Sequence, residues 1–250
     1  SGRPIINMAI GSPDLSPSSE VKQALSESIR DEKSSMYQSY IGLPELREAI
    51  SNFYFKQYDV ELNPVDEILP LMGSKEGVMH ISMAFLNRGD GVLIPNPGYP
   101  TYNSVSKLVG AETFYYNLSE ENYWYPKMDD LKMLKTKKIK LMWINYPHMP
   151  TGADFDEKKL NELVYWAEKN NILLINDNPY SFILNKKPRS ILSLKSSKGV
   201  AIEMNSLSKS FNMAGWRVGM MVGESKYINA VLKVKSIEVQ NMAVSYTHLT

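Results

Sequence analysis

The sequence predicts an α/β fold, a three-layer αβα sandwich with a mostly parallel β-sheet at its centre. Two observations lead to this prediction. Short, continuous apolar runs bounded by Pro and Gly recur along the chain, which is typical of strands buried on both faces. Segments with apolar residues at helical spacing alternate with these runs, as they do in sheets covered by helices on both sides. A chain of 250 residues is long enough to bury such a core.

Three helices are expected before the first strand. The first follows Ser16-Pro17, which supplies start signals, and the second opens at Pro44, because proline is tolerated in a first turn. The third begins after Gly73-Ser74-Lys75. Each carries apolar residues three or four positions apart, at Val21, Leu25 and Ile29, at Leu46, Ile50 and Phe53, and at Val78, Ile81 and Phe85.

Six apolar runs predict strands in the rest of the chain, at residues 92–94, 113–116, 139–145, 172–176, 200–204 and 218–222. Residues 156–169, between the third and fourth of these runs, have the apolar spacing of a helix. Parallel strands present the loops at their carboxyl ends to ligands, so chemistry is expected there. We find no internal repeat and no low-complexity linker.

The composition excludes several classes of site. With no cysteine there are no disulfides, thiolate metal sites or cysteine nucleophiles, and the three histidines are too scattered to predict a metal centre. A formal net charge of +1 gives no general attraction to nucleic acid or membranes. No apolar run approaches the ~20 residues of a membrane span, and the N-terminus lacks a signal-peptide pattern. We therefore expect a cytoplasmic enzyme.

One polar segment, Ser206 to Arg217, directly follows a predicted strand and contains Lys209. Desolvation beside a buried strand lowers the pKa of an amine toward nucleophilic use. A hydroxyl at Ser206 and a guanidinium at Arg217 are the groups expected around a phosphate dianion. A lysine alone is more often a surface residue, so the prediction depends on this combination.

The spacing Ser-x-x-Lys-x7-Arg, closed by Gly-Trp-Arg-Val-Gly, resembles the cofactor-lysine motif of the class I/II aminotransferases, which are fold-type I enzymes that use pyridoxal 5'-phosphate (PLP). The resemblance runs from about residue 5 to residue 235. Further loops match in order: Gly11-Ser12-Pro13-Asp14, Tyr37 with Gly42-Leu43-Pro44-Glu45, Gly73-Ser74-Lys75-Glu76, Asn96-Pro97-Gly98-Tyr99-Pro100, Pro147 to Gly152, and Asp177-Asn178-Pro179-Tyr180.

The resemblance implies a role for each matching residue. Lys209 would hold PLP as a Schiff base and move the proton at the substrate's Cα. Asp177 would keep the pyridine nitrogen protonated, and Tyr180 would donate to the phenolate oxygen. The remaining cofactor-binding residues would be Ser74, Lys75, Ser206 and Arg217 at the phosphate, Tyr99 stacked on the ring, and Tyr37 reaching the phosphate of a neighbouring subunit in a homodimer. Gly11 would belong to the substrate loop.

Plainer interpretations exist for several of these residues. Asp177 has the position of a turn or helix-cap aspartate, and Tyr180 that of a half-buried core tyrosine. Gly73-Ser74-Lys75 opens a helix whose N–H groups accept a phosphate without specialised side chains, but many helices begin with serine. Tyr99 lies in a Pro/Gly-rich turn, where tyrosines often serve packing alone.

The sequence departs from the family in two respects. Met149 stands where the family has an asparagine that donates to the O3′ oxygen of PLP, and Asn145 is a candidate to compensate for it. Members of the family also continue into a smaller domain with the arginine that binds the substrate α-carboxylate. We therefore divide the chain into an N-terminal segment (1–30) that contributes to that small domain and to the substrate loop, a large PLP-binding domain (31–236) and an atypical tail (237–250). We expect this chain alone to be inactive.

The predicted activity is transfer of an amino group from an amino acid to a 2-oxo acid. A C–S lyase that uses the same PLP site for β-elimination is the alternative, because the two enzymes share every residue named above. A regulatory protein that uses the fold as an effector sensor is a third hypothesis, but no helix-turn-helix pattern or basic segment supports it. Aspartate, alanine, aromatic and diaminopimelate substrates all stay open.

Overall fold

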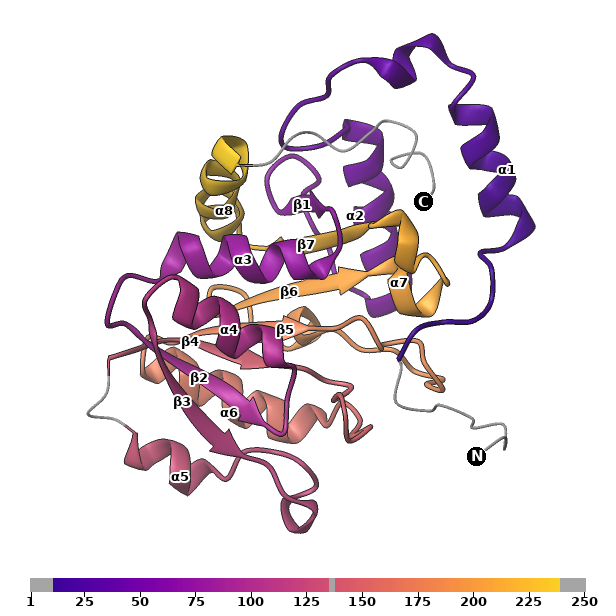
Figure 1. The fold of residues 1–250 in the computed structure, drawn as a ribbon. Helices are drawn as coiled ribbons and strands as arrows, with labels where there is room; N and C mark the ends of the chain where they lie inside the picture. The colour runs from indigo at the N-terminus through magenta and orange to yellow at the C-terminus, as the bar shows by residue number, and fades with distance from the viewer. Residues whose placement is uncertain (1–10, 135–137, 239–250) are drawn as a thin grey trace, which may run out of the picture.

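The computed structural model describes residues 11–134 and 138–238, and these form one seven-stranded β-sheet with helices on both faces (Figure 1). The strand order is β1-β7-β6-β5-β4-β2-β3. Neighbouring strands from β6 across to β3 are parallel, and β7 runs antiparallel to both β1 and β6. The predicted three-layer αβα sandwich with a mostly parallel sheet is thereby confirmed.

The strands in chain order are β1 (Ile68–Leu71), β2 (Gly91–Asn96), β3 (Glu112–Asn117), β4 (Ile139–Ile144), β5 (Leu173–Asp177), β6 (Ala201–Ser206) and β7 (Gly219–Gly223). The α-helices are α1 (Ser19–Ser28), α2 (Pro44–Tyr58), α3 (Ser74–Phe85), α4 (Pro100–Leu108), α5 (Met128–Met133), α6 (Glu157–Lys169), α7 (Leu207–Ser210) and α8 (Ser225–Glu238). Short 3-10 turns occupy Glu32–Ser35, Glu120–Asn122, Ile191–Ser193 and Ala214–Trp216.

Two apolar cores lie on opposite faces of the sheet because successive strand residues point to opposite sides. Along β4, Leu141 and Trp143 pack with α3, α4 and α8, whereas Met142 and Ile144 pack with α2 and α6. All four side chains are buried. This alternation explains why the strand sequences are continuous apolar runs.

Several elements were not predicted from the sequence: β1, α4, α5, α7 and α8. Strand β1 contains Pro70, which argues against a central strand, and the structure places β1 at the sheet edge, where proline is tolerated. Helix α4 begins at Pro100, within a stretch whose sequence is typical of a turn. Because the N–H of a first helical residue has no intrahelical partner, a proline there costs the helix no hydrogen bond.

The predicted division into segments stays a prediction. Helix α8 continues to Glu238, so the proposed boundary between residues 236 and 237 falls inside a helix. Most of the predicted tail lies outside the described residues.

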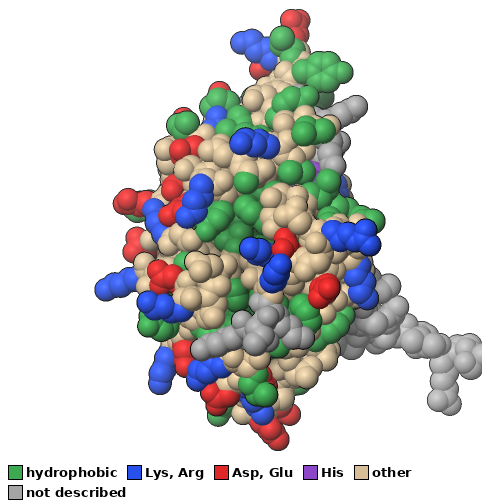
Figure 2. All heavy atoms as spheres, turned by 90° about the vertical axis from the view of Figure 1, so that its left-hand side faces the viewer, with side chains coloured by type: hydrophobic (Ala, Val, Ile, Leu, Met, Phe, Trp, Pro, Cys, Tyr) green, Lys and Arg blue, Asp and Glu red, His purple; other side chains and the backbone are tan. Residues whose placement is uncertain are grey.

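The described surface has mixed charge. Figure 2 shows the face seen from the left-hand side of Figure 1, with Lys and Arg interspersed among Asp and Glu and with scattered apolar side chains. Single-sign patches attract nucleic acid, and this face does not present one. Within the described ranges no helix is long and apolar enough to cross a membrane.

Candidate active site

A pocket of about 240 Å³ lies at the carboxyl end of the parallel strands. It is formed where β5 and β6 end and where α3 and α4 begin, which is the sheet edge at which ligands bind in such folds. Eight of the ten predicted site residues line it: Ser74, Lys75, Tyr99, Asp177, Tyr180, Ser206, Lys209 and Arg217. The structure therefore brings together loops that are far apart in the sequence.

Lys209 lies in the short helix α7, directly after β6. Its side chain is half-buried, and its ammonium donates to the backbone carbonyl of Gly11. The predicted substrate-loop residue Gly11 therefore meets the predicted cofactor lysine, although it is not part of the pocket lining.

Asp177 is the last residue of β5 and its side chain is buried. One carboxylate oxygen, Oδ2, accepts a hydrogen bond of 2.9 Å from the Tyr102 hydroxyl. The other, Oδ1, has no hydrogen-bond partner among the described residues. Burial raises the pKa of Asp177 to about 6, and the Tyr102 hydrogen bond opposes that rise. A buried carboxylate that lines a pocket and has one oxygen without a partner is suited to bind a cationic or N–H donor group.

Tyr102 is a site residue that the sequence interpretation missed. It is buried in the first turn of α4, and its ring stacks on Trp143 with 4.8 Å between ring centroids. Its centroid also lies 5.5 Å from that of Tyr99, in an edge-to-face contact. The available signal was the spacing, because Tyr99 and Tyr102 lie three residues apart at a helix start and so share a face.

The opposite end of the pocket is suited to an anion. Helix α3 begins after Gly73 without a side-chain cap, so its first N–H groups and its dipole are available to a ligand. Arg217 donates to the carbonyls of Ala214 (3.1 Å) and Met72 (3.4 Å). Its guanidinium packs so closely on Gly73 that a Cβ there would lie 2.3 Å from Nη2. Gly73 also has a φ of 84°, which favours glycine.

Two serines complete this end. Ser206 caps α7, with its hydroxyl accepting from the Ser208 backbone N–H at 3.1 Å, and the two hydroxyls lie 2.9 Å apart. Ser208 also lines the pocket and was not among the predicted site residues. The signal for it was present in the sequence, since Ser208 directly precedes Lys209.

Tyr180 lies beside Asp177 at the pocket wall. Burial, and then the neighbouring Asp177, raise the pKa of its phenol above the usual value. A phenol that stays protonated can donate a hydrogen bond to a ligand oxygen.

Met149 lines the pocket, as its position in the motif predicts. Asn145 does not line it: its amide donates to the backbone carbonyl of Asp177 and accepts from the Met149 N–H at 2.7 Å. Asn145 thus ties the β4 loop to the end of β5. Its side-chain contacts give no support to the idea that it replaces the missing asparagine as a donor to a ligand.

Tyr37 lies outside the pocket, in the segment before α2, and is 93% exposed. This placement leaves untested the prediction that it acts at a neighbouring subunit. The described residues contain no group of three acidic, His or Cys side chains able to hold a metal ion.

Fold and site together define a class: an α/β domain in which a lysine, an uncapped helix start and a buried carboxylate line one pocket at the carboxyl end of the parallel strands. The chain belongs to the class I and II aminotransferase family, whose model matches residues 3–239. This confirms the resemblance seen in the sequence.

Individual relatives agree. The LL-diaminopimelate aminotransferase of Dehalococcoides mccartyi (strain CBDB1) is 42% identical over 237 residues, which cover 94% of this chain and 61% of the relative. The Aquifex aeolicus enzyme of the same name is 39% identical over equal shares. The substrate-bound BacF structure from Bacillus subtilis has a TM-score of 0.93 and 38% identity, covering 98% of this chain and 63% of its own. This chain therefore spans about three fifths of the length of these relatives.

Proposed function

We propose that this chain is the cofactor-binding part of a PLP-dependent aminotransferase that moves an amino group from an amino acid to a 2-oxo acid. One observation carries the proposal: Lys209, Asp177 and Arg217 meet at a single pocket although they come from separate loops. The names of the relatives, which are aminotransferases, support the same activity.

The residues present fit PLP. The unpaired Oδ1 of Asp177 matches the protonated pyridine nitrogen, and the uncapped start of α3 with Arg217 matches the phosphate dianion. When bound, PLP would supply an aldehyde that accepts the substrate's amino group and a protonated ring that accepts electron density from the substrate Cα.

The protein's side chains then have separate tasks. Lys209 would hold the cofactor through its side-chain amine and would move the proton between the substrate Cα and the cofactor. Asp177 would keep the pyridine nitrogen protonated. Tyr180 would donate to the phenolate oxygen, while Ser206, Ser74 and Lys75 would bind the phosphate and Tyr99 would pack on the ring.

LL-diaminopimelate is the amino donor we propose to test first, because curated relatives at 36–42% identity carry that name. No observation favours the C–S lyase alternative. A product assay separates the two: amino transfer leaves a 2-oxo acid and an aminated acceptor, whereas β-elimination releases ammonia. We further propose a cytoplasmic homodimer in which the exposed Tyr37 reaches the neighbouring phosphate, with the α-carboxylate arginine outside this chain and the chain inactive alone.

Two experiments test the function. Reduction with borohydride in the presence of PLP should fix a pyridoxyl group on the peptide containing Lys209; a label on Lys75 instead would contradict the site assignment. Activity should be measured on a chain as long as the relatives, with LL-diaminopimelate and 2-oxoglutarate as substrates. Failure to transfer an amino group from any amino acid would overturn the proposal.

A further inference from the structure

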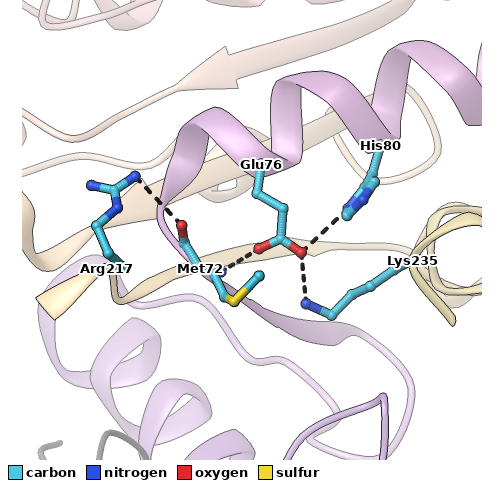
Figure 3. A network of polar contacts seen from close by, with 5 residues as sticks. All are labelled: Met72, Glu76, His80, Arg217 and Lys235. Carbon is cyan, nitrogen blue, oxygen red and sulfur yellow. Dashed lines mark hydrogen bonds and ion pairs between the residues drawn. The ribbon is translucent and has the colours of Figure 1, made fainter. Parts of the chain in front are cut away.

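A buried ion pair connects the start of α3 to the last turn of α8. Glu76 Oε1 lies 2.8 Å from Lys235 Nζ, and the two side chains are only 10% and 5% exposed (Figure 3). His80 Nδ1 lies 3.4 Å from the same oxygen. Burying a charge is costly unless a partner compensates it, so each member of this pair depends on the other.

The second carboxylate oxygen of Glu76 contacts the turn that precedes α3. Glu76 Oε2 accepts the backbone N–H of Met72, and the carbonyl of Met72 accepts Arg217 Nη2 (Figure 3). Side chains therefore hold Met72 at both its N–H and its carbonyl. The next residue is Gly73, on which the Arg217 guanidinium packs. The backbone of Met72 thus connects the ion pair between Glu76 and Lys235 to the phosphate-accepting end of the pocket.

Charge gives Lys235 a second effect at the same place. Glu76 lies in the first turn of α3, near the helix start that is proposed to bind a dianion. An uncompensated carboxylate there would repel phosphate and cancel part of the favourable helix dipole. The ammonium of Lys235 neutralises that carboxylate without itself lining the pocket.

We propose that Lys235 is a positioning residue for the phosphate group of the cofactor. By neutralising and orienting Glu76, it holds the Met72–Gly73 turn in the geometry against which Arg217 packs and phosphate binds. This inference rests on the proposed use of PLP. It assigns a specific role to a buried lysine of α8 that makes no contact with the pocket.

The test compares the dissociation constants of PLP and of pyridoxal, which lacks the phosphate. Lys235→Met should weaken PLP binding about tenfold, the scale of one charge-assisted hydrogen bond. Pyridoxal binding should change less than about twofold, because the ring and aldehyde contacts are untouched. Lys235→Arg, which restores the charge, should recover most of the PLP affinity. If Lys235→Met does not fold, Lys235→Gln removes the charge, keeps a donor and carries the same expectation.

Val231→Ala is the matched control, because Val231 is buried one turn earlier on α8 and contacts the apolar core. It should lower stability while leaving the ratio of the two dissociation constants unchanged. The inference would be overturned if Lys235→Met weakened the binding of PLP and of pyridoxal equally, or weakened neither. It would also be overturned if Val231→Ala changed the ratio of the two dissociation constants as much as Lys235→Met does. A wild-type protein that binds PLP no better than pyridoxal would instead contradict the proposed function.

Discussion

Two carboxylates are buried on neighbouring central strands and point to opposite faces of the sheet. Asp177 ends β5 and contacts Tyr102 of α4, whereas Glu203 lies in β6 and contacts Tyr54 of α2. Burial raises the pKa of both carboxyl groups. By burial alone they would be judged equivalent.

Their hydrogen bonds separate them. Glu203 accepts from the Tyr54 hydroxyl at 3.1 Å, the Asn176 amide at 3.0 Å and the Ile191 N–H at 2.9 Å, so both its oxygens are satisfied. Asp177 keeps one oxygen without a partner among the described residues, and that residue lines the pocket. Because buried polar atoms are almost always paired, an unpaired one at a pocket indicates a ligand site. We therefore expect Glu203 to serve the fold and Asp177 to serve the chemistry.

The largest expected effect is on the rate of amino transfer. Asp177→Asn should slow removal of the Cα proton by about 10³-fold, or about 4 kcal/mol of barrier, because the ring loses its protonated form. Glu203→Gln should change that rate by less than about tenfold. Single-turnover absorbance measurements at saturating PLP, made on a chain as long as the relatives, give both values. Comparable losses in the two variants would remove the distinction.

Stability without cofactor should depend on pH through Asp177. A folded-state pKa of about 6 against an ordinary 3.8 means that the folded protein binds this proton more tightly than the unfolded chain. The contribution of this group to stability is therefore full below pH 4 and is lost as the pH rises through 6, by about 3 kcal/mol at most.

Urea unfolding of the wild type and of Asp177→Asn at pH 4.5 and pH 7.5 measures this effect. The difference between the two proteins isolates Asp177 from other titrating groups. The asparagine variant should gain stability relative to wild type as the pH rises between these values. An equal difference at both pH values would show that Asp177 does not carry the shifted pKa.

Glu203→Gln should destabilise the protein by about 2 kcal/mol. In the variant, an amide NH₂ group replaces one carboxylate oxygen. This group cannot accept the hydrogen bonds that the oxygen accepted, so buried donors lose their partner. The midpoint of urea unfolding at pH 7.5 measures the loss. A stability equal to wild type would mean that the Glu203 hydrogen bonds contribute nothing net.

The smallest expected effects come from removing the tyrosine hydroxyls that donate hydrogen bonds to the two carboxylates. Tyr102→Phe removes a donor from Asp177 and should weaken PLP binding about fivefold, about 1 kcal/mol, because less of the carboxyl group is then ionised. Tyr54→Phe removes a donor from Glu203 and should cost about 1 kcal/mol of stability with PLP affinity unchanged. Titration of the cofactor absorbance measures the PLP affinity of both variants. Weaker PLP binding in Tyr54→Phe than in Tyr102→Phe would contradict the roles assigned to Glu203 and Asp177.

Local pattern predicted much of the fold. The apolar runs that became β2 and β4 to β7 were recognisable because these strands are buried on both faces, whereas β3, at the sheet edge, is largely exposed. The apolar stripes of α1, α2, α3 and α6 were equally clear. In contrast, β1 carries Pro70 and is a strand only because β7 lies beside it, a pairing that joins Ile68 to Val222. No window of local sequence contains that information.

The same division holds for the site. The sequence by itself determined the Lys209 segment, the aspartate at the end of β5 and the glycine turn before α3, because each is a short motif at the end of an element. Only the tertiary structure decided which partners these motifs meet. Tyr102 reaches Asp177 across 75 residues, and Lys235 reaches Glu76 across 159. Such contacts depend on the order of strands in the sheet and on which helices pack side by side, and long-range packing leaves no periodic signal in the chain.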